Sequence, residues 1–196
     1  MPRGPRPESA TGYYHWINRG VNQKKIFHYK DDFIVFLDLV KEYKERFKIQ
    51  LFHYCLMTNH IHLLIRANNR ESLFGFSYYV QRRYAYYYCK TCKWRGQVFQ
   101  RMYKSLPIEK ESYLLECGRY IERNPIRSKL VKTTAEWPYT SYSFYAYGQD
   151  NNLLSKSPMY LEMSSSDKKR QVLYQEYVNQ DRAYDELVDK ILIPNQ

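Results

Sequence analysis

The sequence predicts an α+β fold in which helices pack against one face of an antiparallel sheet. Two observations predict it. The expected elements follow the order strand–helix–strand–strand–helix–strand–helix, and only three residues separate the two central strands, as in an antiparallel hairpin. The chain has 196 residues, of which 44% are hydrophobic, so it is long enough to bury a core as one domain.

The first half of the chain supplies the first strand, a helix and the hairpin. Residues 13–18 (YYHWIN) form the first expected strand. A helix is expected over residues 31–48, where apolar side chains recur at spacings of three and four: Phe33, Phe36, Leu37, Val40, Tyr43 and Phe47. Residues 49–56 and 60–66 are expected strands, and the short turn at 57–59 makes them a hairpin.

The second half adds two helices around a short strand, and then a helical tail. The helix expected over residues 72–88 has a buried stripe made of Leu73, Phe76, Val80, Tyr84 and Tyr87. A strand is expected over 98–105 and a third helix over 109–124, which Pro125 should end or break because it disfavours α geometry at Asn124. A fourth helix is expected from Ser166 onwards, with a narrow apolar seam: Leu173, Tyr177, Gln180, Tyr184, Leu187 and Ile191.

Charge and aromatic content indicate a polyanionic partner. The net charge is +11, and 22 of the 34 aromatic residues are tyrosines. Residues 1–149 carry 25 basic and 12 acidic residues, a net charge of +13, whereas residues 150–196 carry six and eight, a net charge of −2. A basic surface rich in rings suits single-stranded nucleic acid. The composition changes over residues 148–157, which predicts a domain at 1–148 and a linker with a helical extension at 149–196.

Several classes of protein are not expected. No apolar run is long enough for a membrane span, and the first residues contain no apolar signal segment, so the expectation is a cytoplasmic protein without a membrane partner. Four cysteines in a chain of this length do not suggest a disulfide framework. Cys89 and Cys92 form a Cys-x-x-Cys pair, but a zinc ribbon needs a second pair, and Cys55 and Cys117 are single residues.

The densest chemical signal lies in residues 57–65 (MTNHIHLLI). Side chains alternate between the two faces of a strand, so His60 and His62 share one face while Ile61, Leu63 and Ile65 share the other. Two adjacent imidazoles on a rigid strand are pre-aligned to bind a metal ion. A half-buried, hydrogen-bonded pair of histidines is the more ordinary interpretation of this pattern alone.

A second signal lies in residues 116–125 (ECGRYIERNP). On a helix, Tyr120 and Asn124 are four residues apart and lie on nearly the same face, on the flank of the apolar stripe, from which the hydroxyl of Tyr120 can reach the edge of the sheet. In a tyrosine-rich chain, amphipathic packing would also explain Tyr120.

Taken together, these motifs resemble those of the HUH-type single-tyrosine transposases, and more closely those of the REP-associated tyrosine transposases of bacteria. The resemblance extends from residue 1 to about residue 148. It rests on seven segments: 1–6 (MPRGPR), 18–22 (NRGVN), 54–65 (YCLMTNHIHLLI), 99–104 (FQRMYK), 112–115 (SYLL), 120–127 (YIERNPIR) and 137–142 (WPYTSY).

The resemblance implies a ferredoxin-like fold and specific roles for four residues. His60 and His62 would be metal ligands, Asn124 a third, amide-type ligand, and Tyr120 the nucleophile. Imidazole ligands suit zinc, iron or nickel, whereas phosphate chemistry usually uses Mg²⁺ or Mn²⁺, and the resemblance favours Mg²⁺ or Mn²⁺. Tyr103 is a rival nucleophile that lacks an amide four residues later. His53 is interpreted either as a group that supports the metal ligands or as an ordinary strand histidine.

Basic and aromatic residues elsewhere are candidates for contact with DNA. They are Arg3, Arg6, Arg82, Arg83, Lys93, Trp94, Arg95, Arg101 and Lys104. Arg101 stands next to the position where the family usually has an arginine, so that contact is expected to have moved or been lost. Solvated charge and a frayed N-terminus are comparable explanations for most of these residues.

The expected function is therefore that of a DNA transposase and nuclease. It would bind single-stranded hairpins of palindromic repeats, as a monomer or a homodimer. It would cleave and rejoin them through a 5′-phosphotyrosine intermediate. The alternative is a hairpin DNA or RNA binding protein that has lost turnover, and a purely structural role is third.

Overall fold

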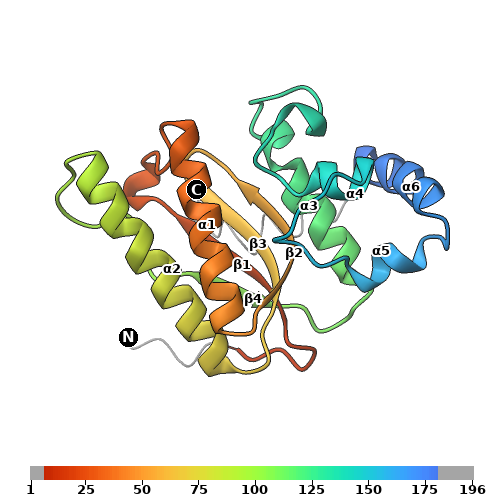
Figure 1. Ribbon diagram of the computed structural model, residues 1–196, viewed down its shortest axis with the longest axis horizontal. Coiled ribbons are helices and arrows are strands. Elements are labelled where there is room, and N and C mark those ends of the chain that lie inside the picture. The colour runs from red at the N-terminus through yellow and green to blue at the C-terminus, as the bar shows by residue number, and fades with distance from the viewer. Residues whose placement is uncertain (1–6, 181–196) are drawn as a thin grey trace.

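A four-stranded antiparallel sheet lies at the centre of the structure, a computed structural model that describes residues 7–180 (Figure 1). Its strands are β1 (Tyr13–Arg19), β2 (Gln50–Leu56), β3 (His60–Arg66) and β4 (Lys104–Pro107). They are arranged in the order β2-β3-β1-β4. This is the order of a ferredoxin-like sheet, so the expected α+β fold is confirmed.

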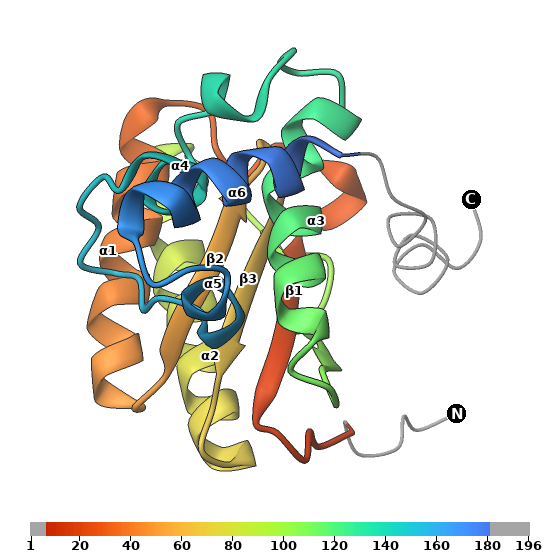
Figure 2. The ribbon, with the colours of Figure 1, turned by 90° about the vertical axis from the view of Figure 1, so that its right-hand side faces the viewer.

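Helices cover both faces of this sheet, not one face as the sequence led us to expect. Helices α1 (Lys30–Arg46) and α2 (Arg70–Thr91) pack on one face, and α3 (Tyr113–Arg127) packs on the other (Figure 2). Three further helices lie on the α3 side: α5 (Pro158–Glu162) and α6 (Asp167–Asn179) contact α3, and α4 (Tyr142–Tyr147) contacts α6. Short 3-10 helices lie at Val21–Gln23 and Thr134–Glu136.

The two-sided arrangement follows from the apolar content of the central strands. Ile61, Leu63 and Ile65 pack with α1 and α2, whereas Leu64 packs with α3 from the opposite side. All four side chains are fully buried. A strand that is buried on both faces has a nearly continuous apolar sequence. Residues 61–65 (IHLLI) have such a sequence, with His62 as the one polar residue in it.

Most of the expected elements are confirmed to within a few residues. The first strand, the hairpin and the first two helices form as the apolar spacing predicts, and the helix expected from Ser166 forms as α6, with the Ser166 hydroxyl accepting from the N–H of Lys169. Helices α4 and α5 were not expected. The part of the apolar seam formed by Tyr184, Leu187 and Ile191 lies outside the described residues.

The strand expected over residues 98–105 is wrong for most of its length. Strand β4 begins only at Lys104, and the segment before it makes isolated bonds to the end of β1, among them Gln100 N–H to the Arg19 carbonyl at 2.8 Å. Tyr103 turns inward and stacks on Trp16, with 5.9 Å between ring centroids. The apolar pattern in this segment therefore reflects packing rather than strand pairing.

The expected end of the third helix at Asn124 is also wrong, because α3 continues through Pro125 to Arg127. Proline has no N–H and leaves the Ile121 carbonyl without its backbone donor. The side-chain amide of Asn124 supplies a substitute, since its Nδ2 lies 3.3 Å from the Ile121 oxygen and 2.9 Å from the Tyr120 oxygen. A local side-chain bond thus allows the proline within the last turn.

The segment expected to be a linker is bonded to the core. The N–H of Ser155 donates to the Leu51 carbonyl at 2.8 Å, and Nζ of Lys44 donates to the Leu153 carbonyl at 2.7 Å. The division into 1–148 and 149–196 stays a prediction. Within residues 7–180 no helix is long and apolar enough to cross a membrane.

Helix α3 approaches the sheet closely at Gly118. A Cβ atom at this position would lie 2.6 Å from Nε2 of His53, a residue of β2. We expect Gly118→Ala to lower the free energy of unfolding by about 1–3 kcal/mol, the usual cost of overpacking a core, despite the better helix propensity of alanine. Urea unfolding followed by circular dichroism measures this change.

The matched control is the same substitution in a His53→Ala background, where the opposing ring is gone. There Gly118→Ala should cost little or stabilise the helix slightly. An equal cost in both backgrounds would show that contact with His53 does not explain the glycine.

Candidate active site

A row of histidines crosses the sheet face that α3 covers. His60 and His62 project from β3 on this face, with ring centroids 5.0 Å apart, as the strand alternation predicts. His15 of β1 lies beside His62, with ring centroids 5.1 Å apart. His15 was assigned no role from the sequence, although its place in strand alternation puts it on the same face as Ile17 and Arg19.

Hydrogen bonds orient both candidate ligand rings. Nδ1 of His60 lies 2.7 Å from Oδ1 of Asn59, and a carbonyl oxygen only accepts, so Nδ1 of His60 carries the proton. Nδ1 of His62 lies 2.9 Å from Nε2 of His15. When His62 donates in that bond, Nε2 of His60 and Nε2 of His62 are both left with a lone pair, which is the state a metal ligand needs.

Burial keeps these imidazoles neutral. It lowers the pKa of His15 to about 3 and, with a further contribution from the positive charge of Arg19, lowers the pKa of His60 to about 4. Burial also places the pKa of His62 well below its ordinary value, and the neighbouring histidines, Arg19 and Arg127 act in the same direction. At neutral pH the row is uncharged and able to coordinate a cation.

Helix α3 places Tyr120 directly over this row. The ring centroid of Tyr120 lies 5.8 Å from that of His15 and 6.0 Å from that of His62, and both contacts are edge-on. The guanidinium carbon of Arg127 lies 4.8 Å from the centre of the Tyr120 ring. The tyrosine as a whole is only 3% exposed.

Asn124 lies one turn after Tyr120 and meets the same histidines. Its side chain lies close to His60 and opposes the lowering of the His60 pKa. Because Nδ2 is held by the carbonyls of Tyr120 and Ile121, the amide oxygen is the atom that faces away from the helix backbone. The Asn-Pro pair therefore both preserves the helix and aims an oxygen at the histidine row.

Two arginines of this site were not assigned a role from the sequence. Arg19 pairs directly with His60 across the β1–β3 ladder, and Arg127 follows Tyr120 by seven residues, which is two helical turns. Both lie within the motifs quoted above, and their spacing from His60 and Tyr120 could have indicated them.

The expected DNA-contacting residues fall into groups. Six of them are exposed: Arg82, Arg83, Lys93, Arg95, Arg101 and Lys104. Trp94 is half-buried, and Nζ of Lys24 lies 3.1 Å from the centre of its ring. Residues 93–101 lie at the same end of the sheet as His60, because Phe99 bridges Gly20 at the end of β1 (Figure 1). Arg82 and Arg83 lie on α2, on the other face of the sheet. Arg3 and Arg6 lie outside the described residues.

The alternative sites gain no support from the structure. Tyr103 packs with Trp16 among the side chains under α1 and α2, on the sheet face opposite the histidine row. All four cysteines are free thiols. Within residues 7–180, no group of three His, Cys, Asp or Glu side chains is arranged to hold a metal ion.

Comparison with known proteins supports the transposase interpretation. The family model described as IS200-like transposase matches residues 9–124. A solved REP-associated tyrosine transposase, bound to a REP hairpin, shares the fold with a TM-score of 0.60 at 12% identity, over 80% of this chain and 98% of that one. A transposase from Deinococcus radiodurans R1 gives a TM-score of 0.42 at 17% identity, over 66% and 95% of the two chains. No protein with a curated description matches the sequence.

A double-mutant cycle with Pro125 tests whether the bond from Asn124 to the Ile121 carbonyl compensates for the missing proline N–H. We expect Asn124→Ala to lower the free energy of unfolding by about 1–3 kcal/mol, because it leaves a buried carbonyl without a donor. In a Pro125→Ala background the new backbone N–H serves Ile121, so the cost of Asn124→Ala should fall. Urea unfolding of the four proteins in this cycle gives the coupling energy, and a value of zero would contradict the compensating role.

Proposed function

The chain belongs to the family of IS200-like transposases, and we propose that it cleaves and rejoins single-stranded DNA through Tyr120. One observation carries this proposal. Tyr120 and Asn124 on α3 meet His60 and His62 on β3 in one cluster, although the two pairs are about sixty residues apart in the chain.

The proposed reaction is a transesterification at phosphorus. The Tyr120 hydroxyl loses its proton and its oxygen bonds to the phosphorus, while the bond from phosphorus to the 3′ oxygen breaks. The leaving strand takes up a proton and becomes a 3′-hydroxyl, and the 5′ end stays attached as a phosphotyrosine. A 3′-hydroxyl attacking this linkage reverses the step, so strands are rejoined without an external energy source.

The two neutral imidazoles and the amide oxygen fit a divalent cation, and the phosphate chemistry of the family favours Mg²⁺ or Mn²⁺ as that ion. His60 and His62 would hold it through their Nε2 atoms and Asn124 through its amide oxygen. When bound, it would neutralise charge on the scissile phosphate and orient it.

Two guanidinium groups support the phosphate at the same place. Arg19 and Arg127 are close enough to His62 to lower its pKa, so they place positive charge beside the reacting tyrosine. Arginine suits phosphate because its planar donors pair with two oxygens at once. The exposed basic residues of the 93–101 loop would extend this positive surface along the bound strand.

The proposed substrate is a hairpin formed by a palindromic repeat. The shared fold with a protein solved on a REP hairpin supports this choice, as does the net charge of +11. The candidate contacts are those predicted from the sequence, and monomer and homodimer both remain compatible with the proposal.

Replacing Tyr120 by phenylalanine tests the nucleophile. We expect Tyr120→Phe to abolish the covalent protein–DNA adduct and to leave affinity for hairpin DNA nearly unchanged, because only one hydroxyl is lost. The assay is a denaturing gel with labelled hairpins from repeats flanking the gene, with Mn²⁺ or with EDTA. Tyr103→Phe is the matched control and should form the adduct like the wild type.

Persistence of the adduct in Tyr120→Phe and its loss in Tyr103→Phe would move the nucleophile to Tyr103. A native-gel shift without any adduct in the wild type would favour the alternative, a DNA or RNA binding protein without turnover.

Replacing His15 tests the proposed metal site. His15→Phe keeps a ring of similar shape but removes the partner of His62 Nδ1, and loss of such an orienting bond typically lowers metal affinity about 10- to 100-fold. Calorimetric titration of the protein with Mn²⁺ measures this change directly. His28→Phe, which alters a histidine bonded to Tyr88 on the opposite face, should bind Mn²⁺ like the wild type.

A further inference from the structure

A buried carboxylate lies on the helix that carries the proposed nucleophile. Glu122 is fully buried and stands midway between Tyr120 and Asn124 on α3. Two residues along a helix rotate a side chain by about 200°, so Glu122 faces away from the histidine row, towards β2 and the C-terminal helices. The proposed reaction does not use it.

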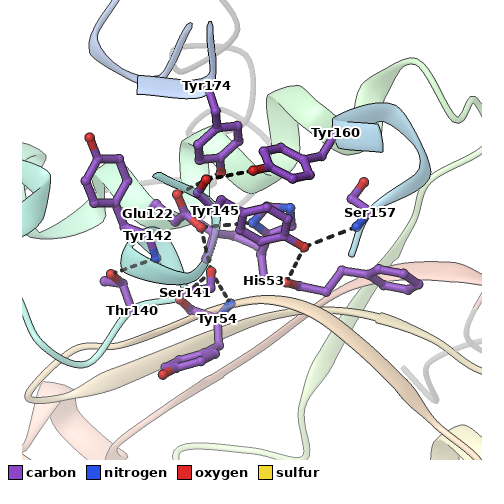
Figure 3. Close-up of polar contacts among 12 residues, drawn as sticks. His53, Tyr54, Glu122, Thr140, Ser141, Tyr142, Tyr145, Ser157, Tyr160 and Tyr174 are labelled. Atoms are coloured by element: carbon purple, nitrogen blue, oxygen red, sulfur yellow. Dashed lines mark hydrogen bonds and ion pairs between the residues drawn. The ribbon is translucent and has the colours of Figure 1, made fainter. Parts of the chain in front are cut away.

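Three separate segments bond to this carboxylate (Figure 3). Nδ1 of His53 on β2 lies 3.0 Å from Oε1 of Glu122, and the Ser141 hydroxyl donates to the same oxygen at 2.6 Å. The Tyr174 hydroxyl of α6 donates to Oε2 at 2.8 Å. The sheet, the start of α4 and α6 therefore all meet α3 at one side chain.

His53 is closely confined in this cluster. Its ring stacks on Tyr145 with centroids 4.2 Å apart, and its other neighbour is the backbone of α3 at Gly118, where a Cβ would lie 2.6 Å from Nε2. Gly118 and Glu122 are one helical turn apart, so the ring fits a notch on α3 that has a carboxylate at one end. The sequence left His53 open between a supporting and an ordinary role.

Burying a carboxylate is costly unless its partners are in place. If α3 slid by one residue, or rotated, Glu122 would leave His53 and the backbone notch at Gly118 would close against the ring. The pair therefore favours one position of α3 along the sheet. The same position determines where Tyr120 and Asn124 meet the histidines, because all of these residues share one helix.

We propose that His53 and Glu122 are positioning residues for the nucleophile: their buried pair holds α3 at the height on the sheet where Tyr120 lies over His15 and His62. This inference rests on the proposed function of Tyr120. It assigns to His53 a role in holding the helix rather than in supporting the metal ligands.

The test compares Glu122→Leu, Glu122→Gln and the double variant His53→Leu/Glu122→Leu. We expect Glu122→Leu to lower the single-turnover rate of adduct formation at saturating DNA about 100-fold, the scale associated with a misplacement of about 1 Å. Affinity for the hairpin should be unchanged, because the pair lies away from the exposed basic residues. Glu122→Gln keeps an acceptor oxygen and should retain an intermediate rate.

The double variant distinguishes an effect on the position of α3 from an effect on the stability of the protein. Replacing a buried pair by apolar side chains often restores stability, so the variant should unfold at urea concentrations near those of the wild type and still react slowly. Ser77→Ala is the matched control, since it removes a buried hydroxyl that bonds to Trp16 under α2. It should lose stability and keep the wild-type single-turnover rate.

Wild-type rates in both the Glu122→Leu and double variants would overturn the positioning role while leaving Tyr120 as nucleophile. If the wild type itself forms no adduct, the crystal structure of the double variant decides. Displacement of the Tyr120 ring from His15 and His62 supports positioning, and an unmoved α3 overturns it.

Discussion

The close contact between α3 and the histidine-bearing face of the sheet is the constraint on which the rest of the site depends. Gly118 lets the helix approach until a bare backbone meets the His53 ring. Around it, Leu64 of β3 packs with Leu114 and Ile121 of the helix. Only this approach brings the Tyr120 ring within about 6 Å of the His15 and His62 rings. The packing of α3 on the sheet therefore also determines the geometry of the site.

The electrostatics of the site complement the packing. Burial leaves His15, His60 and His62 neutral, while Arg19 and Arg127 bring fixed positive charge close to His62. Interactions between charges are stronger in such surroundings than in water. A phosphodiester bound beside His62 would meet the positive charge of both guanidinium groups. Positive charge at this place is consistent with membership of a transposase family, because DNA is a polyanion.

Strand alternation and helical spacing were sufficient to predict the central pieces of the site. Alternation placed His60 and His62 on one face, and the four-residue spacing placed Tyr120 with Asn124. What the sequence could not show was the pairing between distant strands, which alone brings His15 to His62 and Arg19 to His60. Helices on both faces were missed because a continuous apolar strand was taken as one-sided. The helix end at Asn124 was wrong because a side-chain bond replaced the donor that Pro125 lacks.

The C-terminal segment, which lies outside the resemblance, is structurally part of the same assembly. Tyr174 donates to Glu122, and the guanidinium groups of Arg119 and Arg123 donate to the carbonyls of Gln180 and Val178 where α6 ends. Carbonyls at a helix end lack intrahelical partners, so two α3 arginines stabilise the end of α6. The helix that carries Tyr120 is therefore held from the sheet by His53 and from the chain's acidic last quarter by α6. A division at residue 148 would cut across this buried polar network, and the extension contributes to the frame that holds the helix carrying Tyr120.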